Sequence, residues 1–300
     1  MNIFISGGLG YVGRHLSNTL LQDGHTVTAV GRRDNPANMI QHSNFSYLAA
    51  DTTKPGDWQA SIPTQDVVIN LTGRSIFTLW TAGVKKDIYD SRILTTRNIA
   101  EALQDSEKAV FFSTSAIGYY GERGDDTLTE EEPPGDDFLA TVSKDWEYEA
   151  MKVPGHIRVV IPRFGIVLSN DGGAMAKMLP AFKFFLGGRL GSGRQWFPWI
   201  HLQDLVAAYR FAIADGDIIG PANWCAPNPV RNEELTRKLA EKLKRPVMLP
   251  APGFMVKTLL GDFGKTLLCS QRAEPAVLQK AGYPFSYPTL DSALDEIVKK

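Results

Sequence analysis

The first half of the chain alternates short apolar runs with segments in which apolar residues recur at helical spacing. Residues 3–5 (Ile-Phe-Ile) form an apolar run ended by glycines, which predicts a buried parallel strand. In residues 11–22 the apolar positions follow one helix face, and Gly24 ends the pattern. Further strands are expected at residues 26–30, 45–50, 67–69, 109–112 and 158–161, and helices at residues 85–103 and 138–151. This alternation predicts βαβ crossovers and an α/β fold with a Rossmann-type, doubly wound parallel sheet.

The pattern loosens after about residue 165, where glycine pairs and prolines interrupt the chain. Helical spacing returns at residues 202–214 and 232–243, and a strand is expected at residues 222–225. We therefore predict a Rossmann domain over residues 1–165 and a smaller C-terminal α/β substrate region over residues 166–300. Elements around residues 201–226 are expected to return to the first sheet.

Composition and charge narrow the class of protein. Hydrophobic residues make up 43% and charged residues 22% of the chain, which is typical of a soluble globular protein. A net charge of -1 gives no attraction to nucleic acid or to an anionic membrane. Neither a signal peptide nor a spanning segment is evident, so we expect a cytoplasmic protein. Cys225, Cys269 and five scattered histidines predict neither a disulfide nor a metal site.

A glycine-rich segment joins the first strand to the first helix. Gly7, Gly10 and Gly13 follow the GxxGxxG spacing, with Tyr11 and Val12 opening the helix. The first glycine allows a tight turn, the second lets the backbone approach a diphosphate, and the third lets helix and strand pack closely. The helix N-terminus then points at the negative charge. These residues predict a dinucleotide site.

The end of the second strand distinguishes the two nicotinamide cofactors. An NAD site carries Asp or Glu there, which accepts a hydrogen bond from the ribose 2′-hydroxyl. This chain has Arg32 and Arg33 instead, two guanidinium groups able to hold a 2′-phosphate. NADP(H) is therefore the expected cofactor and NAD the less favoured one. The alternative is a pair of solvated surface arginines.

Later segments resemble the extended short-chain dehydrogenase/reductase superfamily, with its NAD-dependent epimerases and dehydratases. The resemblance is closer to a poorly characterised epimerase-like branch with a C-terminal extension of unknown function. The segments that carry it are Asn-Leu-Thr-Gly-Arg-Ser-Ile at 70–76, Ser-Ala-Ile-Gly-Tyr-Tyr-Gly at 115–121, Met-Leu-Pro at 178–180, Gly-Ser-Gly-Arg-Gln at 191–195 and Trp-Ile-His-Leu-Gln-Asp at 199–204.

The resemblance implies the rest of the site. Ser115 is expected to bind a substrate oxygen beside the nicotinamide, and Tyr119 or Tyr120 to donate a proton. Each of these three residues has an equally simple structural interpretation, as a group that satisfies nearby backbone or packs in the core. The further cofactor-binding residues are expected to be Asp51, Leu71, Thr72, Gly73, Ser113 and Arg163.

Two positions depart from the superfamily pattern. The superfamily uses a Tyr-x-x-x-Lys pair, in which the lysine lowers the pKa of the phenol. Here Leu139 and Ser143 occupy those positions, and Lys144 lies one residue off, which rotates it by about 100° around the helix, toward solvent. Phe197 stands where sugar-nucleotide enzymes carry an arginine.

Three functions remain open from the sequence. The first is an NADP(H)-dependent oxidoreductase acting on a small carbonyl or alcohol substrate, and the second is a nucleotide-sugar epimerase or dehydratase. The third is a cofactor-binding redox sensor or regulatory protein without catalysis. A homodimer through the helix at residues 85–103 is expected by analogy alone.

Overall fold

A seven-stranded parallel sheet forms the centre of the molecule, as seen in the computed structural model, which describes residues 1–34, 39–247 and 250–299. The short strand β6 (Ser115–Ala116) pairs with β8 outside this row. The seven strands, in spatial order, are β12 (Gly220–Trp224), β8 (Arg158–Phe164), β5 (Val110–Ser113), β4 (Val67–Asn70), β1 (Asn2–Ser6), β2 (Thr26–Gly31) and β3 (Phe45–Ala49). The predicted doubly wound α/β fold is confirmed.

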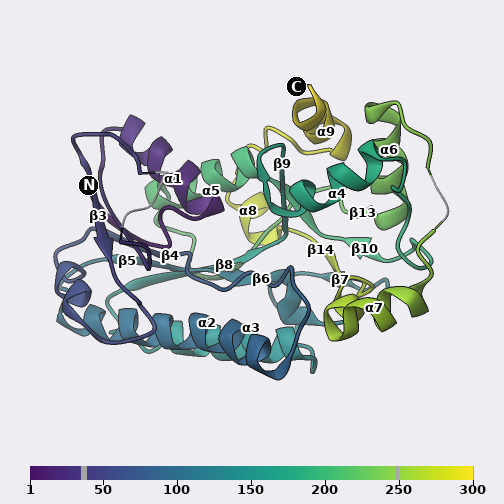
Figure 1. The fold of residues 1–300 in the computed structure, drawn as a ribbon. Coiled ribbons are helices and arrows are strands. Elements are labelled where there is room, and N and C mark those ends of the chain that lie inside the picture. The colour runs from purple at the N-terminus through teal and green to yellow at the C-terminus, as the bar shows by residue number, and fades with distance from the viewer. Residues whose placement is uncertain (35–38, 248–249, 300) are drawn as a thin grey trace.

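Helices cover both faces of this sheet (Figure 1). One face carries α1 (Tyr11–Gln22) and α5 (Leu202–Ala214), which pack on each other. The other face carries α2 (Ala82–Ala102) and α3 (Phe138–Ala150), beside the 3₁₀ turns η1 (Asp57–Ser61) and η2 (Leu103–Asp105). The expected homodimer through α2 stays a prediction.

The core explains why the first strand carries apolar residues without alternation. Ile3 and Ile5 point into the cluster under α1 and α5, whereas Phe4 points into the cluster under α2. All three side chains are fully buried. A strand covered on both faces needs apolar residues at every position, because successive side chains point to opposite faces.

The second half of the chain does not form a separate body. Strand β12 joins the central sheet beside β8, and α8 (Ala276–Lys280) packs against β12. Farther along, β14 (Arg272–Ala273) pairs with β7 (Thr127–Leu128), and the Tyr283 hydroxyl donates to the carbonyl oxygen of Asp204 at 2.8 Å. Segments from the C-terminal quarter therefore lie against elements from the first 165 residues.

Most of the remaining elements surround a third apolar cluster, on the right of Figure 1, which buries Met175, Leu235 and Leu294. The helix at residues 253–266 packs instead beside Phe77 and Trp80. Several of these helices lack a clear sequence signal, because Gly172 and Gly173 stand at the beginning of α4, Pro180 lies inside it, and Gly261 has a φ of 58° inside α7. These elements are α4 (Gly173–Lys183), α6 (Asn232–Leu243), α7 (Gly253–Thr266), α9 (Leu290–Val298), β9 (Ile166–Ser169) with β11 (Trp199–His201), and β10 (Trp196–Phe197) with β13 (Val230–Arg231). No described helix is both long and apolar enough to cross a membrane.

Candidate functional site

Most residues expected to bind the cofactor lie along one edge of the central sheet. In a parallel sheet the carboxyl ends of all strands meet at the same edge, where ligands bind in doubly wound folds. Strands β2, β1, β4 and β5 are neighbours, so the loops that follow them are brought together. They carry Gly7, Gly10, Tyr11, Val12 and Gly13 after β1, Arg32 and Arg33 after β2, Leu71, Thr72 and Gly73 after β4, and Ser113 at the end of β5.

The glycine loop is too crowded to accept side chains at its buried positions. A Cβ on Gly13 would lie 2.2 Å from the carbonyl oxygen of Gly7, and Gly7 itself has a φ of 78°. Gly10 is exposed, begins α1 as its N-cap and donates its N–H to Gly7 O at 2.8 Å. The loop therefore has the bare backbone and open helix N-terminus that a diphosphate requires.

Arg32 and Arg33 are exposed immediately after β2. Neither forms an ion pair with another described residue, and Tyr47 donates its hydroxyl to the carbonyl oxygen of Arg33 at 2.9 Å. Asp51 lies one strand farther out, after β3, and is also exposed. Its carboxylate accepts hydrogen bonds from the backbone N–H and hydroxyl of Thr53 at 3.2 and 2.8 Å, an ordinary turn arrangement.

The loop after β4 is held to the sheet by short polar contacts. The Asn70 side chain accepts from Thr72 N at 3.1 Å and donates to Thr96 Oγ1 on α2 at 2.8 Å. The hydroxyls of Thr72 and Ser6 also hydrogen-bond each other. Ser113, the register partner of Asn70 on β5, is buried, and its hydroxyl has no hydrogen-bond partner among the described residues.

A buried polar network occupies the position where catalysis was expected. Ser115 donates its hydroxyl to Glu147 Oε1 at 2.6 Å, and Arg163 donates to both Glu147 oxygens at 2.8 Å. Arg163 Nη1 donates to the Tyr120 hydroxyl at 2.8 Å. The Tyr120 oxygen also lies 2.7 Å from Asn223 Oδ1. We call Ser115, Tyr120, Glu147, Arg163 and Asn223 the Glu147 cluster.

The Glu147 cluster changes the expected role of three residues. Arg163 is 2% exposed and uses its donors on protein groups, which leaves it no free edge for a cofactor. Tyr120 is fully buried, and burial raises the pKa of its phenol. Its hydroxyl is already used on protein groups, which weighs against Tyr120 as a proton donor. The Ser115 proton points at Glu147, so Ser115 can accept from a ligand but cannot also donate to one.

Tyr119 differs from its neighbour. Its side chain is half-buried, and its hydroxyl makes no hydrogen bond with another described residue. The Arg163 guanidinium lies 3.6 Å above the centre of its ring, a close cation–π contact. Of the three predicted catalytic hydroxyls, it alone is free to reach a ligand.

Helix α3 explains both the confirmed and the missed residues of this region. Lys144 is exposed, as predicted from its one-residue offset. Ser143 is buried, and Leu139 lies against Gly118, where an added Cβ would contact it at 3.4 Å. Glu147 was missed, although it follows Leu139 and Ser143 at a strict four-residue spacing on the same helix face. A charged residue is seldom buried unless it is paired, and its partner Arg163 is remote in the sequence.

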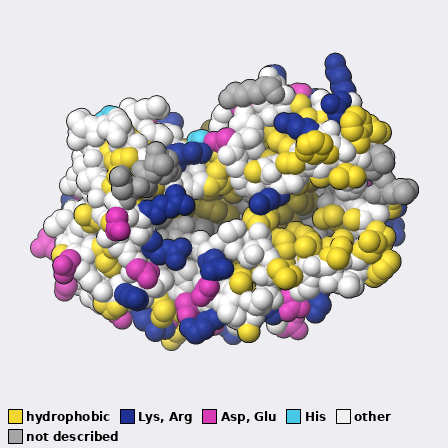
Figure 2. Space-filling model, in the orientation of Figure 1, with side chains coloured by type: hydrophobic (Ala, Val, Ile, Leu, Met, Phe, Trp, Pro, Cys, Tyr) yellow, Lys and Arg dark blue, Asp and Glu magenta, His cyan; other side chains and the backbone are white. Residues whose placement is uncertain are grey.

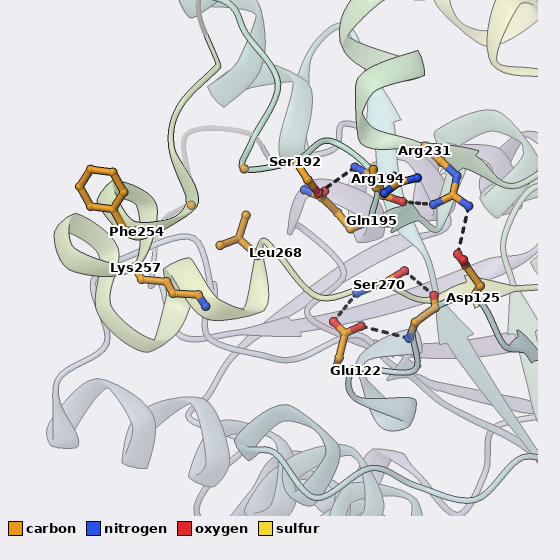
Figure 3. Close-up of a pocket in the computed structure, with 13 residues that line it drawn as sticks. Glu122, Asp125, Ser192, Arg194, Gln195, Arg231, Phe254, Lys257, Leu268 and Ser270 are labelled. Atoms are coloured by element: carbon orange, nitrogen blue, oxygen red, sulfur yellow. Dashed lines mark hydrogen bonds and ion pairs between the residues drawn. The ribbon is translucent and has the colours of Figure 1, made fainter.

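A cleft opens beside the loop that follows Tyr120, visible as the hollow between the lobes in Figure 2. It has a volume of about 620 Å³. Figure 3 shows Lys257 extending from α7 into this space, with Glu122 across from it. Arg194 also lines the cleft, while Arg231 pairs with Asp125 at 3.0 Å and stacks over Trp196 at 4.4 Å.

The C-terminal quarter, which is part of the region 166–300, supplies part of this cleft. Ser270 donates its hydroxyl to Gly124 O at 2.5 Å, and its N–H donates to Glu122 at 2.7 Å. Trp199 is buried, whereas Trp196 and Phe197 are half-buried in β10. No group of His, Cys, Asp and Glu in the described part of the chain is arranged to hold a metal.

Comparison with known proteins places the chain in a family. The model of the NAD dependent epimerase/dehydratase family matches residues 3–223, and that of a domain of unknown function, DUF1731, matches residues 251–297. The "Epimerase family protein SDR39U1 homolog, chloroplastic" of Arabidopsis thaliana is 35% identical over 303 residues, covering 100% of this chain and 87% of the relative. The "Epimerase family protein YfhF" of Bacillus subtilis is 35% identical over 304 residues, covering 99% and 98%.

Solved structures agree with this placement. The human epimerase family protein SDR39U1 (isoform 2), crystallised with NADPH, is 32% identical to this chain and superposes on it with a TM-score of 0.88. The superposition covers 100% of each chain. The UDP-glucuronic acid 4-epimerase of Bacillus cereus has a TM-score of 0.79 at 17% identity, covering 100% of this chain and 98% of that one, and shares the fold alone. This chain therefore belongs to the NAD dependent epimerase/dehydratase family, with a DUF1731 domain following the family segment.

Proposed function

We propose that the protein is an NADP(H)-dependent oxidoreductase that acts on a small carbonyl or alcohol substrate. The observation that carries the cofactor part is the pair Arg32 and Arg33, exposed after β2 beside a glycine loop with an open backbone. The full-length similarity to a human relative crystallised with NADPH supports it. Leu71, Thr72, Gly73 and Ser113 complete the cofactor edge.

The residues around the site divide the chemical work. When bound, the cofactor supplies a hydride to a carbonyl carbon or takes one from an alcohol. Tyr119 is the proton donor of the proposal, because its hydroxyl is the free one of the three candidates. Arg163 and Glu147 are positioning residues: they hold the Tyr119 ring and the Ser115 hydroxyl in place. The substrate is placed beside Tyr119, at the cofactor edge of the sheet.

The cofactor proposal is tested by comparing NADPH with NADH in a direct binding measurement such as calorimetry. NADPH is expected to bind more tightly by roughly 1.5–3 kcal/mol, the range for hydrogen bonds to a charged group. The variant Arg32→Ala/Arg33→Ala should erase that difference, because NADH lacks the 2′-phosphate. Arg237→Ala, which removes an exposed arginine from α6, is the matched control. Equal affinities in the unmodified protein would refute the proposal.

A nucleotide-sugar epimerase is the second candidate, and one observation favours it. The cleft of about 620 Å³ carries Arg194, Arg231 and Lys257, cations suited to a charged ligand. Phe197, in the place of the expected arginine, weighs against it. Epimerisation of a nucleotide sugar without net change in the cofactor would favour this candidate, and net NADPH oxidation with a panel of simple carbonyls would favour the first.

A redox sensor without catalysis is the third candidate. It is favoured by the commitment of Ser115 and Tyr120 to the Glu147 cluster and by the absence of the Tyr-x-x-x-Lys pair at Leu139 and Ser143. Tight NADPH binding without turnover of any carbonyl or nucleotide sugar would select it. Turnover that disappears in Tyr119→Phe would exclude it.

A further inference from the structure

Arg92 is a cation at the cofactor edge of the sheet, and no counter-charge pairs with it within the described residues. Its Nη1 donates to the carbonyl oxygens of Arg74 and Ile88 at 3.1 and 3.0 Å. By contrast, the neighbouring Arg74 and Arg97 pair with Asp87 and Glu149. No described carboxylate forms an ion pair with Arg92, and burial lowers the pKa of its guanidinium to about 10. The group therefore remains charged at neutral pH.

The position of Arg92 links two parts of the site. Its guanidinium lies against Gly73, where an added Cβ would stand 3.0 Å from Cζ. The same Cζ lies 5.2 Å from the centre of the Trp146 ring on α3. Arg92 therefore sits between the loop after β4 and the helix that lacks the Tyr-x-x-x-Lys pair.

Two buried donors on strands and helices next to α2 also lack an acceptor among the described residues. Within the described residues, neither Trp146 Nε1 nor Ser113 Oγ has a hydrogen-bond partner, although both side chains are buried. Ser113 pairs in register with Asn70, whose side chain reaches Thr96, one turn beyond Arg92 on α2. Indole and guanidinium groups can only donate, so this set needs an oxygen acceptor. Buried donors left without one carry a desolvation cost.

The free edge of the guanidinium indicates which acceptor fits. Nη1 is used on backbone carbonyls, whereas Nε and Nη2 make no hydrogen bond with another described residue. These two N–H groups form one side of the guanidinium fork, which matches the two oxygens of a carboxylate. A neutral hydroxyl or carbonyl would use one of them and leave the charge unbalanced.

We propose that Arg92 binds a carboxylate of the substrate, so that the protein acts on a small oxo- or hydroxy-acid. The proposal rests on the oxidoreductase function proposed above and names its substrate class.

The test titrates the NADP⁺-loaded protein with acetate and oxalate, and with acetamide and oxamide as neutral counterparts, by calorimetry. The carboxylates are expected to bind, and the amides are not. Arg92→Gln should weaken carboxylate binding roughly 10- to 100-fold, the loss of charged hydrogen bonds. Arg92→Lys keeps the positive charge but lacks the paired N–H groups of the guanidinium, so it should lose less carboxylate affinity than Arg92→Gln. Arg97→Gln, on the same helix and paired with Glu149, is the matched control and should change nothing.

NADPH affinity, measured on the same variants, separates the alternatives. The proposal expects Arg92→Gln to bind NADPH within about twofold of the unmodified protein. A large loss of NADPH affinity with intact carboxylate binding would overturn it, since Arg92 would then serve the cofactor. So would carboxylate binding that is absent in the unmodified protein or unchanged in Arg92→Gln.

Two further outcomes are also decisive. If Arg92→Gln does not fold, Arg92→Lys decides, and a folded lysine variant with unchanged carboxylate affinity would overturn the proposal. If the unmodified protein fails to bind NADPH, the proposed function fails, and the same carboxylate titration on the free protein still tests Arg92.

Discussion

The glycine loop and the Glu147 cluster both lie at the carboxyl ends of parallel strands, but backbone atoms form the first and side chains form the second. The loop is backbone: Gly7 and Gly13 lie so close that a Cβ between them would stand at 2.2 Å. The cluster is side chain: Glu147 on α3 holds Ser115 and Arg163, and Arg163 reaches Tyr120. Gly10 faces solvent, whereas the charges of the cluster are buried.

This difference predicts how each region responds to substitution. An exposed loop position has little to do with the stability of the fold, so a change there should affect ligand binding. Removing one partner of a buried charge pair should instead lower the stability of the fold, because the other charge is left in the interior without compensation. The same contrast separates Arg163, whose charge is balanced inside the protein, from Arg92, whose charge is not.

The largest effect is expected from Glu147→Ala. The substitution leaves the buried Arg163 guanidinium without its counter-charge, which should lower the free energy of unfolding by about 3–5 kcal/mol. Urea unfolding measures it. Glu241→Ala, which breaks an exposed ion pair with Arg237, should cost at most about 1 kcal/mol. The double variant Glu147→Ala/Arg163→Met should regain part of the loss, and failure to do so would mean that the charge is not the cause.

Gly10→Val should abolish the binding of both NADPH and NADH, because a branched side chain would occupy the path of the diphosphate. The fold should persist: Gly10 is exposed with a φ of -69°, and beyond its chain neighbours an added Cβ would meet just one described atom, Gly7 O at 3.0 Å. Gly155→Val, in open space, is the control. Normal cofactor binding by the Gly10 variant would place the site elsewhere, and unfolding would break the contrast with the cluster.

A pair of adjacent tyrosines gives a smaller and sharper comparison. Tyr120→Phe removes a hydroxyl that hydrogen-bonds Arg163 and Asn223, and should lower the free energy of unfolding by about 1–3 kcal/mol. Tyr119→Phe removes a hydroxyl without a described partner and should leave stability nearly unchanged while lowering turnover. Thermal unfolding and a carbonyl-reduction assay check the two. If Tyr120→Phe lowered turnover and Tyr119→Phe lowered stability, Tyr120 would be the proton donor and Tyr119 the structural residue.

The smallest effect is expected from Lys144→Ala. The side chain is exposed and pairs with no described carboxylate, so both stability and turnover should stay near those of the unmodified protein. Steady-state kinetics at saturating cofactor measure it. A large fall in kcat with cofactor affinity intact would show that this lysine works in the site after all.

Local patterns predicted helices in both halves of the chain closely. The predicted helices at residues 11–22, 202–214 and 232–243 coincide with α1, α5 and α6. Each depends on apolar spacing and a clear beginning or end, which the chain carries locally. The helices α4, α7 and α9 were missed, since glycines and Pro180 weaken the first two and packing in a shared cluster stabilises α4 and α9.

The sequence by itself determined the glycine loop, the arginines after β2 and the solvent-facing Lys144, because each follows from positions a few residues apart. Only the tertiary structure decided which hydroxyls and charges are free. Whether Tyr119 or Tyr120 can donate depends on Arg163 and Asn223, 43 and 103 residues away from Tyr120. Whether Arg92 or Arg163 is paired depends on where α2 and α3 place their side chains. Burial and pairing belong to contacts between distant segments, and short-range patterns carry no record of them.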